Sequence, residues 1–185
     1  MKRSDTKVGV ISKLALMIAV SCVFVLIVRV PYPPAPFLVY DPADVPIYIA
    51  TFAFGPGAGL LLTAVVSLIQ AFVLGGDGVY GFLMHFLATG AFVIVSGVIY
   101  KFNKTKKGAL IAFVSALVAM VAVMCLANLI VTPIFLGVPR QAVIPMLLPI
   151  IIPFNLIKGG VNGMLTFMVY KKLSPFLHGS KWDKN

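Results

Sequence analysis

Long apolar stretches limit the fold of this 185-residue chain more than any other feature. The hydrocarbon core of a bilayer is ~30 Å thick, and an apolar helix needs about 20 residues to cross it. Five long stretches of this kind take up most of the sequence and leave no room for a separate soluble domain. The sequence therefore predicts a single all-α integral membrane domain over residues 1–185.

The charge content supports the same class of protein. Charged residues make up 11% of the chain and hydrophobic ones 61%, whereas roughly 25% of the residues in a soluble domain are charged. A net charge of +10 can indicate nucleic-acid binding. Here, however, the lysines and arginines stand at the ends of apolar stretches, without interleaved aromatic residues. We interpret them as signals of membrane orientation and expect no nucleic-acid partner.

Prolines and glycines divide the apolar sequence into helices. Four prolines between Pro31 and Pro36 favour an extended segment, and Gly55-Pro56-Gly57 breaks an apolar stretch that is too long for one span. A glycine-rich turn at 75–78 and a lysine-rich loop at 101–107 separate the later helices. We therefore expect six transmembrane helices, the second of them short, at about 8–30, 42–54, 58–74, 79–100, 108–136 and 144–170.

The lysine-rich segments also predict the orientation. The N-terminus, the 101–107 loop and the C-terminal tail are rich in lysine, which is typical of cytoplasmic segments. An even number of crossings must then separate the N-terminus from the loop. Helices one to four meet this condition, and two more helices return the tail to the cytoplasm, so both ends lie inside. The second helix is too short to cross comfortably alone, so we expect its neighbours to surround it.

Common catalytic signatures are missing from the sequence. It contains no GxxxxGK[ST], HExxH or GxSxG motif and no paired-cysteine spacing. His85 stands alone in the fourth helix, where a packed or hydrogen-bonded role is commoner than a ligand role. We therefore expect no enzyme activity, no ATP hydrolysis by this chain and no bound metal.

Polar residues inside the last helices are candidates for binding. Lys158 lies mid-way along the sixth helix, where a cation costs at least ~2.5 kcal/mol. Asn155, Lys158 and Asn162 share one helical face, and Asn128 of the fifth helix could face the same space. Two interpretations remain open: Lys158 pairs with an aspartate between helices, or the face lines a ligand cavity. We favour the cavity.

Aspartates and aromatic residues gather near the expected outer side. Asp41 and Asp44 open the second helix, where they could cap it or interact with its dipole, while one of them could meet a ligand or Lys158. Any single aromatic residue here fits a membrane-interface belt. Together with the amides, these side chains fit a pocket for a flat molecule with polar edges. The aromatic residues are Tyr32, Phe37, Tyr40, Tyr48 and Tyr80.

A pair of small residues marks the first helix. Ala15 and Ala19 are spaced so that both lie on one face, where a partner helix can approach closely. Such pairs are common in apolar helices, so the spacing alone is a weak indication of docking.

Several segments resemble the riboflavin-specific S component of energy-coupling factor (ECF) transporters. The similarity covers nearly the whole chain and is most specific at Pro153-Phe154-Asn155-Leu156-Ile157-Lys158-Gly159. The other matching segments are Tyr40-Asp41-Pro42-Ala43-Asp44-Val45-Pro46, Ala50-Thr51-Phe52-Ala53-Phe54-Gly55-Pro56, Asn128-Leu129-Ile130-Val131 and Tyr170-Lys171-Lys172-Leu173. The chain departs from the family pattern at Val66-Ser67, where Lys-Asn is frequent, at His85, where Asn is usual, and at 40–44, where Leu-Asp-Phe-Ser-Asp is usual.

The resemblance implies a six-helix subunit of the bacterial cell membrane that captures riboflavin outside the cell and carries no cofactor. Such subunits work with a transmembrane coupling protein, the T component, and two ABC ATPases. Ala15 and Ala19 match the AxxxA contact that many S components use to dock on the coupling protein. Among the residues discussed above, the resemblance implies a ligand site formed by Tyr40, Asp41, Asp44, Tyr48, Asn128, Asn155 and Lys158. Flavin mononucleotide, another water-soluble vitamin, or a stand-alone secondary transporter are the alternatives.

Overall fold

The computed structural model describes residues 7–178, which are mostly helical. Two short strands form an antiparallel hairpin after the first helix, with Val30 paired to Tyr40. The 3₁₀ turn Ile144–Met146 and the π-helical turn Leu147–Ile151 lead into the last helix. The elements are α1 (Lys7–Ile27), β1 (Val30–Tyr32), β2 (Ala35–Tyr40), α2 (Asp44–Phe54), α3 (Pro56–Phe72), α4 (Gly78–Phe102), α5 (Lys106–Leu136), α6 (Arg140–Val143) and α7 (Ile152–His178).

Local sequence explains most of the boundaries. The proline-rich segment is extended, and α1 ends at Ile27, before the expected end near residue 30, because Val30 already pairs in the hairpin. Gly55, with φ of 94°, separates α2 from α3, and Pro56 occupies the first turn of α3. Irregular turns replace the first part of the expected sixth helix, since Pro145 and Pro149 cannot donate backbone hydrogen bonds.

Four helical segments are long and apolar enough to cross a membrane: Lys7–Ile27, Gly78–Phe102, Lys106–Leu136 and Arg140–Tyr170. The helices α2 and α3 are shorter, with 11 and 17 residues. As its length led us to expect, α2 is surrounded by protein and contacts α1, α3, α4 and α7. At its centre, Tyr48 is fully buried and stacks on Phe92 with 3.9 Å between ring centroids.

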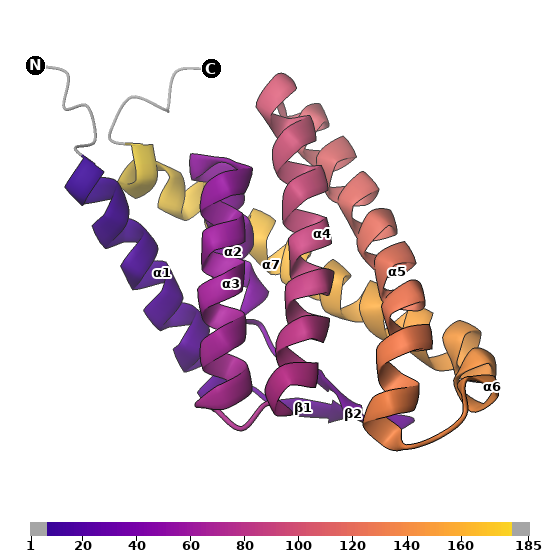
Figure 1. Ribbon diagram of the computed structural model, residues 1–185. Helices are drawn as coiled ribbons and strands as arrows, with labels where there is room; N and C mark the ends of the chain where they lie inside the picture. Colours follow the sequence, from indigo (N-terminus) through magenta and orange to yellow (C-terminus); the bar gives the residue numbers. More distant parts are fainter. Residues whose placement is uncertain (1–6, 179–185) are drawn as a thin grey trace, which may run out of the picture.

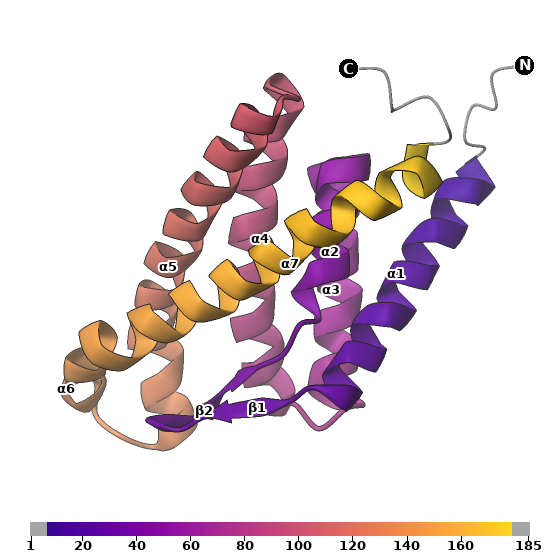
Figure 2. The same cartoon turned by 180° about the vertical axis from the view of Figure 1, so that it is seen from behind.

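The lysine-rich segments share one end of the bundle. The start of α1, the end of α7 and the turn between α4 and α5 lie together there, and the hairpin lies at the opposite end (Figure 1). Seen from behind, α7 runs diagonally across the other helices between these two ends (Figure 2). The lysines of the described residues at the first end include Lys7, Lys101, Lys104, Lys106 and Lys107.

Close packing at the α2–α3 break gives a first prediction. A Cβ added at Gly97 of α4 would lie 2.7 Å from Pro56 Cβ and 3.0 Å from Pro56 Cα, so Gly97→Ala should lower the free energy of unfolding by about 1–3 kcal/mol. Gly90 of the same helix is the matched control, because its added Cβ would meet only Leu60, at 3.8 Å. Thermal unfolding in detergent checks this. Equal melting temperatures for the two variants would contradict the packing argument.

Candidate ligand-binding site

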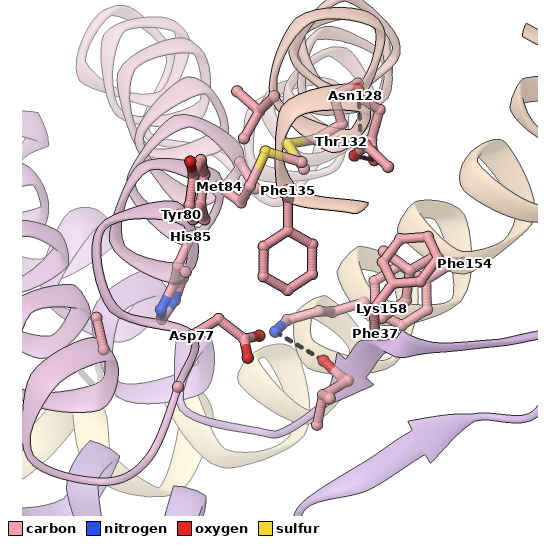
Figure 3. A pocket seen from close by; sticks show the side chains of 18 of the residues that line it. Phe37, Asp77, Tyr80, Met84, His85, Asn128, Thr132, Phe135, Phe154 and Lys158 are labelled. Carbon is pink, nitrogen blue, oxygen red and sulfur yellow. Dashed lines mark hydrogen bonds between the residues drawn. The ribbon is translucent and has the colours of Figure 1, made fainter. Parts of the chain in front are cut away.

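A cavity opens at the hairpin end of the bundle. Its volume is about 140 Å³, and it is open to the outside. Its walls come from β2, the end of α3, the start of α4, the outer half of α5 and the start of α7. Aromatic rings from four of these elements surround it in Figure 3, namely Phe37, Tyr80, Phe135 and Phe154. Segments distant in the sequence therefore form one cavity with aromatic and polar walls, which is the lining typical of small-molecule sites.

The hairpin and α7 hold each other in place beside the cavity. The Tyr32 and Phe154 rings lie 5.4 Å apart, and Ala35 and Leu38 of β2 are buried in the same cluster. Because Phe154, Asn155 and Lys158 follow one another along the start of α7, this contact sets the position of the polar residues of α7 relative to β2.

Lys158 and Asp41 form an ion pair in the cavity wall. Their Nζ and Oδ2 atoms are 2.9 Å apart, and the Lys158 side chain is only 14% exposed. The same Asp41 oxygen accepts a hydrogen bond from Gln70 Nε2 at 3.2 Å, while Oδ1 accepts one from Ala43 N at 3.1 Å. Lys158 therefore pairs with an aspartate and also lines a cavity, while its contact with a ligand stays a prediction.

Asp44 connects three helices just behind the cavity. Its Oδ1 lies 2.9 Å from His85 Nε2 and accepts a hydrogen bond from Thr89 Oγ1 at 2.7 Å, and its Oδ2 accepts one from Asn162 Nδ2 at 3.0 Å. These partners belong to α4 and α7, whereas Asp44 begins α2. Asp44 thus joins α2 to α4 and α7 through buried polar contacts beside the cavity. The N-cap of α2 is Ala43, so neither aspartate caps this helix in the expected way.

Tyr40 extends this polar cluster to the hairpin. Its hydroxyl donates a hydrogen bond to Asn162 Oδ1 at 3.1 Å. Burial raises the pKa of the Tyr40 phenol, although the nearby Lys158 ammonium acts in the opposite direction. The phenol therefore keeps the proton that it donates. Tyr40 supports the cavity from outside its wall.

Asn128 of α5 and Asn155 of α7 line the cavity, and each side chain is anchored to its own helix. Asn128 Nδ2 donates to Met124 O and Asn155 Nδ2 to Ile151 O, both at 2.8 Å. Thr132 Oγ1 donates to Asn128 Oδ1 at 2.8 Å. These bonds hold the amides in one orientation before any ligand arrives, which lowers the entropy cost of binding.

The structure brings together only part of the expected site. Asp41, Asn128, Asn155 and Lys158 line the cavity. Tyr40 and Asp44 lie behind its wall, and Tyr48 is in the helix core, stacked on Phe92, because it lies on an inward face of the enclosed α2.

The sequence also left cavity residues unassigned. Gln70, Asp77 and His85 line the cavity, although we treated Asp77 as part of a turn and His85 as a packing residue. Gln70 and Asp77 lie at the end of α3 and before the start of α4, and that position was the available signal, because these helix ends meet at the hairpin end of the bundle.

Ala15 and Ala19 lie apart from the cavity, on α1. Both are exposed in the bundle, so their methyl groups do not pack between helices of this chain. Among the described residues, no group of three His, Cys, Asp or Glu side chains could hold a metal ion.

Comparison with known proteins identifies the family. The sequence profile of the family described as ECF transporter, substrate-specific component, matches residues 10–170. This chain is an ECF transporter S component. A solved S component of a bacterial ECF transporter has the same fold, with a TM-score of 0.81 and 31% identity, over 93% of this chain and 99% of the other.

Curated relatives of this S component are transport proteins. The riboflavin transporter RibU of Staphylococcus aureus (strain TCH60) is 32% identical over 154 residues, which are 80% of each chain. The riboflavin transporter FmnP of Bacillus subtilis (strain 168) is 30% identical over 168 residues, or 85% of this chain and 88% of the relative. The expected transport role is confirmed, and the chain is a transporter component and not an enzyme.

Proposed function

We propose that this S component captures riboflavin in the cavity at the hairpin end. The similarity to two riboflavin transporters, at 30–32% identity over most of the chain, carries the assignment. The chemistry of the cavity supports it, because aromatic rings can stack on a flat ring system while amide and ammonium groups meet its polar edge. The binding residues of this proposal are Asp41, Asn128, Asn155 and Lys158, with Tyr40 and Asp44 supporting them.

The charge distribution supports an orientation in the bacterial cell membrane. The lysines at the end opposite the hairpin mark the cytoplasmic side by the positive-inside rule. The cavity then opens outside the cell, and both termini lie inside. In this arrangement α1 to α5 and α7 all cross, and the 11-residue α2 is tolerated because protein surrounds it.

Delivery into the cell requires partners in this proposal. Within this chain the sequence carries no nucleotide-binding motif, so ATP must be hydrolysed by other subunits. The T component docks on the exposed Ala15/Ala19 face of α1, and two ABC ATPases drive uptake. The residues that bind riboflavin are therefore different from the residues that dock on the T component.

Titration with riboflavin tests the capture step. The purified chain in detergent, without ATP, should quench riboflavin fluorescence through ring stacking and gain thermal stability as riboflavin is added. The same titration with flavin mononucleotide measures how strictly the site selects riboflavin. Absence of quenching, together with thermal stabilisation by another vitamin, would overturn the flavin assignment and leave the family assignment standing.

A further inference from the structure

One wall of the cavity carries polar atoms that have no hydrogen-bond partner in the described residues. Gln70 Oε1 and His85 Nδ1 are buried without a hydrogen bond. Buried polar atoms without partners are costly, so the presence of two of them beside one cavity calls for a ligand group that satisfies them. Asp77, on the turn between α3 and α4, also lines the cavity, and its exposed carboxylate makes no capping hydrogen bond.

The contact with Asp44 determines the chemical character of His85. Its Nε2 lies 2.9 Å from Asp44 Oδ1, and an ionised carboxylate only accepts hydrogen bonds. Nε2 therefore donates its proton to Asp44, and Nδ1 has no hydrogen-bond partner. The His85 side chain is 8% exposed, so Nδ1 lies in a protected environment, where a hydroxyl group can serve it as donor or as acceptor. Likewise, Gln70 uses its Nε2 for Asp41 and presents Oε1 as a free acceptor.

Asp77 has an unusual backbone for an aspartate at a helix start. It is the N-cap of α4, yet it has φ of 48° and its side chain makes no capping hydrogen bond. An aspartate at a helix start often makes such a bond, and aspartate adopts a left-handed backbone more readily than most residues other than glycine. The conformation instead leaves the carboxylate free on the cavity wall, pointing toward its centre in Figure 3.

The opposite side of the cavity has a different chemistry. In Figure 3, Phe37, Phe154 and Lys158 lie across the cavity from His85. Phe37 and Phe154 present aromatic surface, and Lys158 presents an ammonium already paired with Asp41. A ligand that satisfies both sides must therefore join a flat ring system to a part rich in hydrogen-bond donors.

We propose that Gln70, Asp77 and His85, which we name the acceptor wall, bind the hydroxyl-bearing chain of the ligand. A hydroxyl can donate a hydrogen bond to Gln70 Oε1 or to the Asp77 carboxylate, and it can serve His85 Nδ1 as donor or as acceptor. The ring system then lies against Phe37 and Phe154. This inference rests on the proposed function and specifies which part of riboflavin, its ribityl chain or its ring, each wall recognises.

Two flavins separate the contributions of chain and ring. Lumiflavin carries a methyl group in place of the ribityl chain but keeps the ring system. The acceptor wall predicts that Asp77→Ala and Gln70→Met each weaken riboflavin binding about five- to tenfold, the effect of losing one hydrogen bond, while lumiflavin affinity changes less than about twofold. Gln70→Met also removes the hydrogen bond from Gln70 to Asp41. Any indirect effect of that loss should weaken the binding of riboflavin and of lumiflavin equally.

A second variant of Asp77 tests whether this residue contributes to ligand binding or to the stability of the folded protein. Asp77→Gly removes the carboxylate and suits the left-handed backbone, so the unliganded protein should melt at or above the wild-type temperature while riboflavin binding weakens. If the Asp77 and Gln70 variants lose equal affinity for riboflavin and lumiflavin, or lose affinity for neither, the acceptor wall is overturned and the proposed function stands. Wild-type protein that binds neither flavin would overturn the proposed function, and the acceptor wall with it.

Discussion

The double change Ala15→Trp and Ala19→Trp should abolish riboflavin uptake while riboflavin binding by the isolated subunit stays near the wild-type level. Both alanines are exposed on α1, one turn apart, and lie away from the cavity residues. A partner helix can approach closely only where each position carries no more than a methyl group, and two indole rings would hold it away. Uptake by cells that contain the coupling subunits, and co-purification with the T component, measure the effect.

A matched pair on α5 provides the control. Val118 and Ala122 have the same spacing and are also exposed. Trp at both of these positions should leave uptake intact, because the proposed docking face lies on α1. If the α1 variant loses riboflavin binding and uptake together, the alanines serve packing and the docking proposal is wrong. If it loses neither, the partner docks on another surface.

Lys158→Met should weaken riboflavin binding by about ten- to a hundredfold. The loss of a charged hydrogen-bond donor to a ligand costs about 1.5–3 kcal/mol. The structure adds a second consequence, because Asp41 is 1% exposed and would keep a buried charge without its counter-ion. Breaking a buried ion pair in this way costs about 3–5 kcal/mol, so the melting temperature should fall as well.

A double variant separates these two effects. Asp41→Asn with Lys158→Met removes both charges and should recover much of the thermal stability without recovering the affinity. Lys104→Met, in the exposed turn between α4 and α5, is the matched control and should change neither property. Wild-type affinity in the double variant would show that Lys158 serves only the ion pair and does not contact the ligand.

Local signals in the sequence anticipated much of the helical framework. The extended proline-rich segment, the break at Gly55-Pro56 and the turn near Asp77 depend on the backbone limits of proline and glycine, which act within a few residues. The pairing of Val30 with Tyr40 was not predicted, because strand register depends on contacts with the rest of the bundle, including that of Tyr32 with Phe154.

The candidate site was predicted less completely for a similar reason. Lys158 and Asn155 were recognisable because polar groups are rare inside apolar helices. Tyr48 was grouped with the outer aromatic residues, but sequence proximity does not reveal which side of a fully enclosed helix faces a cavity. Gln70 and Asp77 were overlooked, since a polar residue at a helix end needs no functional explanation until the neighbouring walls are known.

Uptake of labelled riboflavin tests whether this chain delivers riboflavin into cells only together with its partner subunits. Cells without their own riboflavin transporter would receive this chain alone, this chain with a T component and two ABC ATPases, or the same set with inactive ATPases. We expect uptake only in cells that contain the full set with active ATPases. Cells that contain this chain alone should still bind riboflavin at their surface. Sustained accumulation by cells that contain this chain alone would contradict the account and identify a stand-alone transporter.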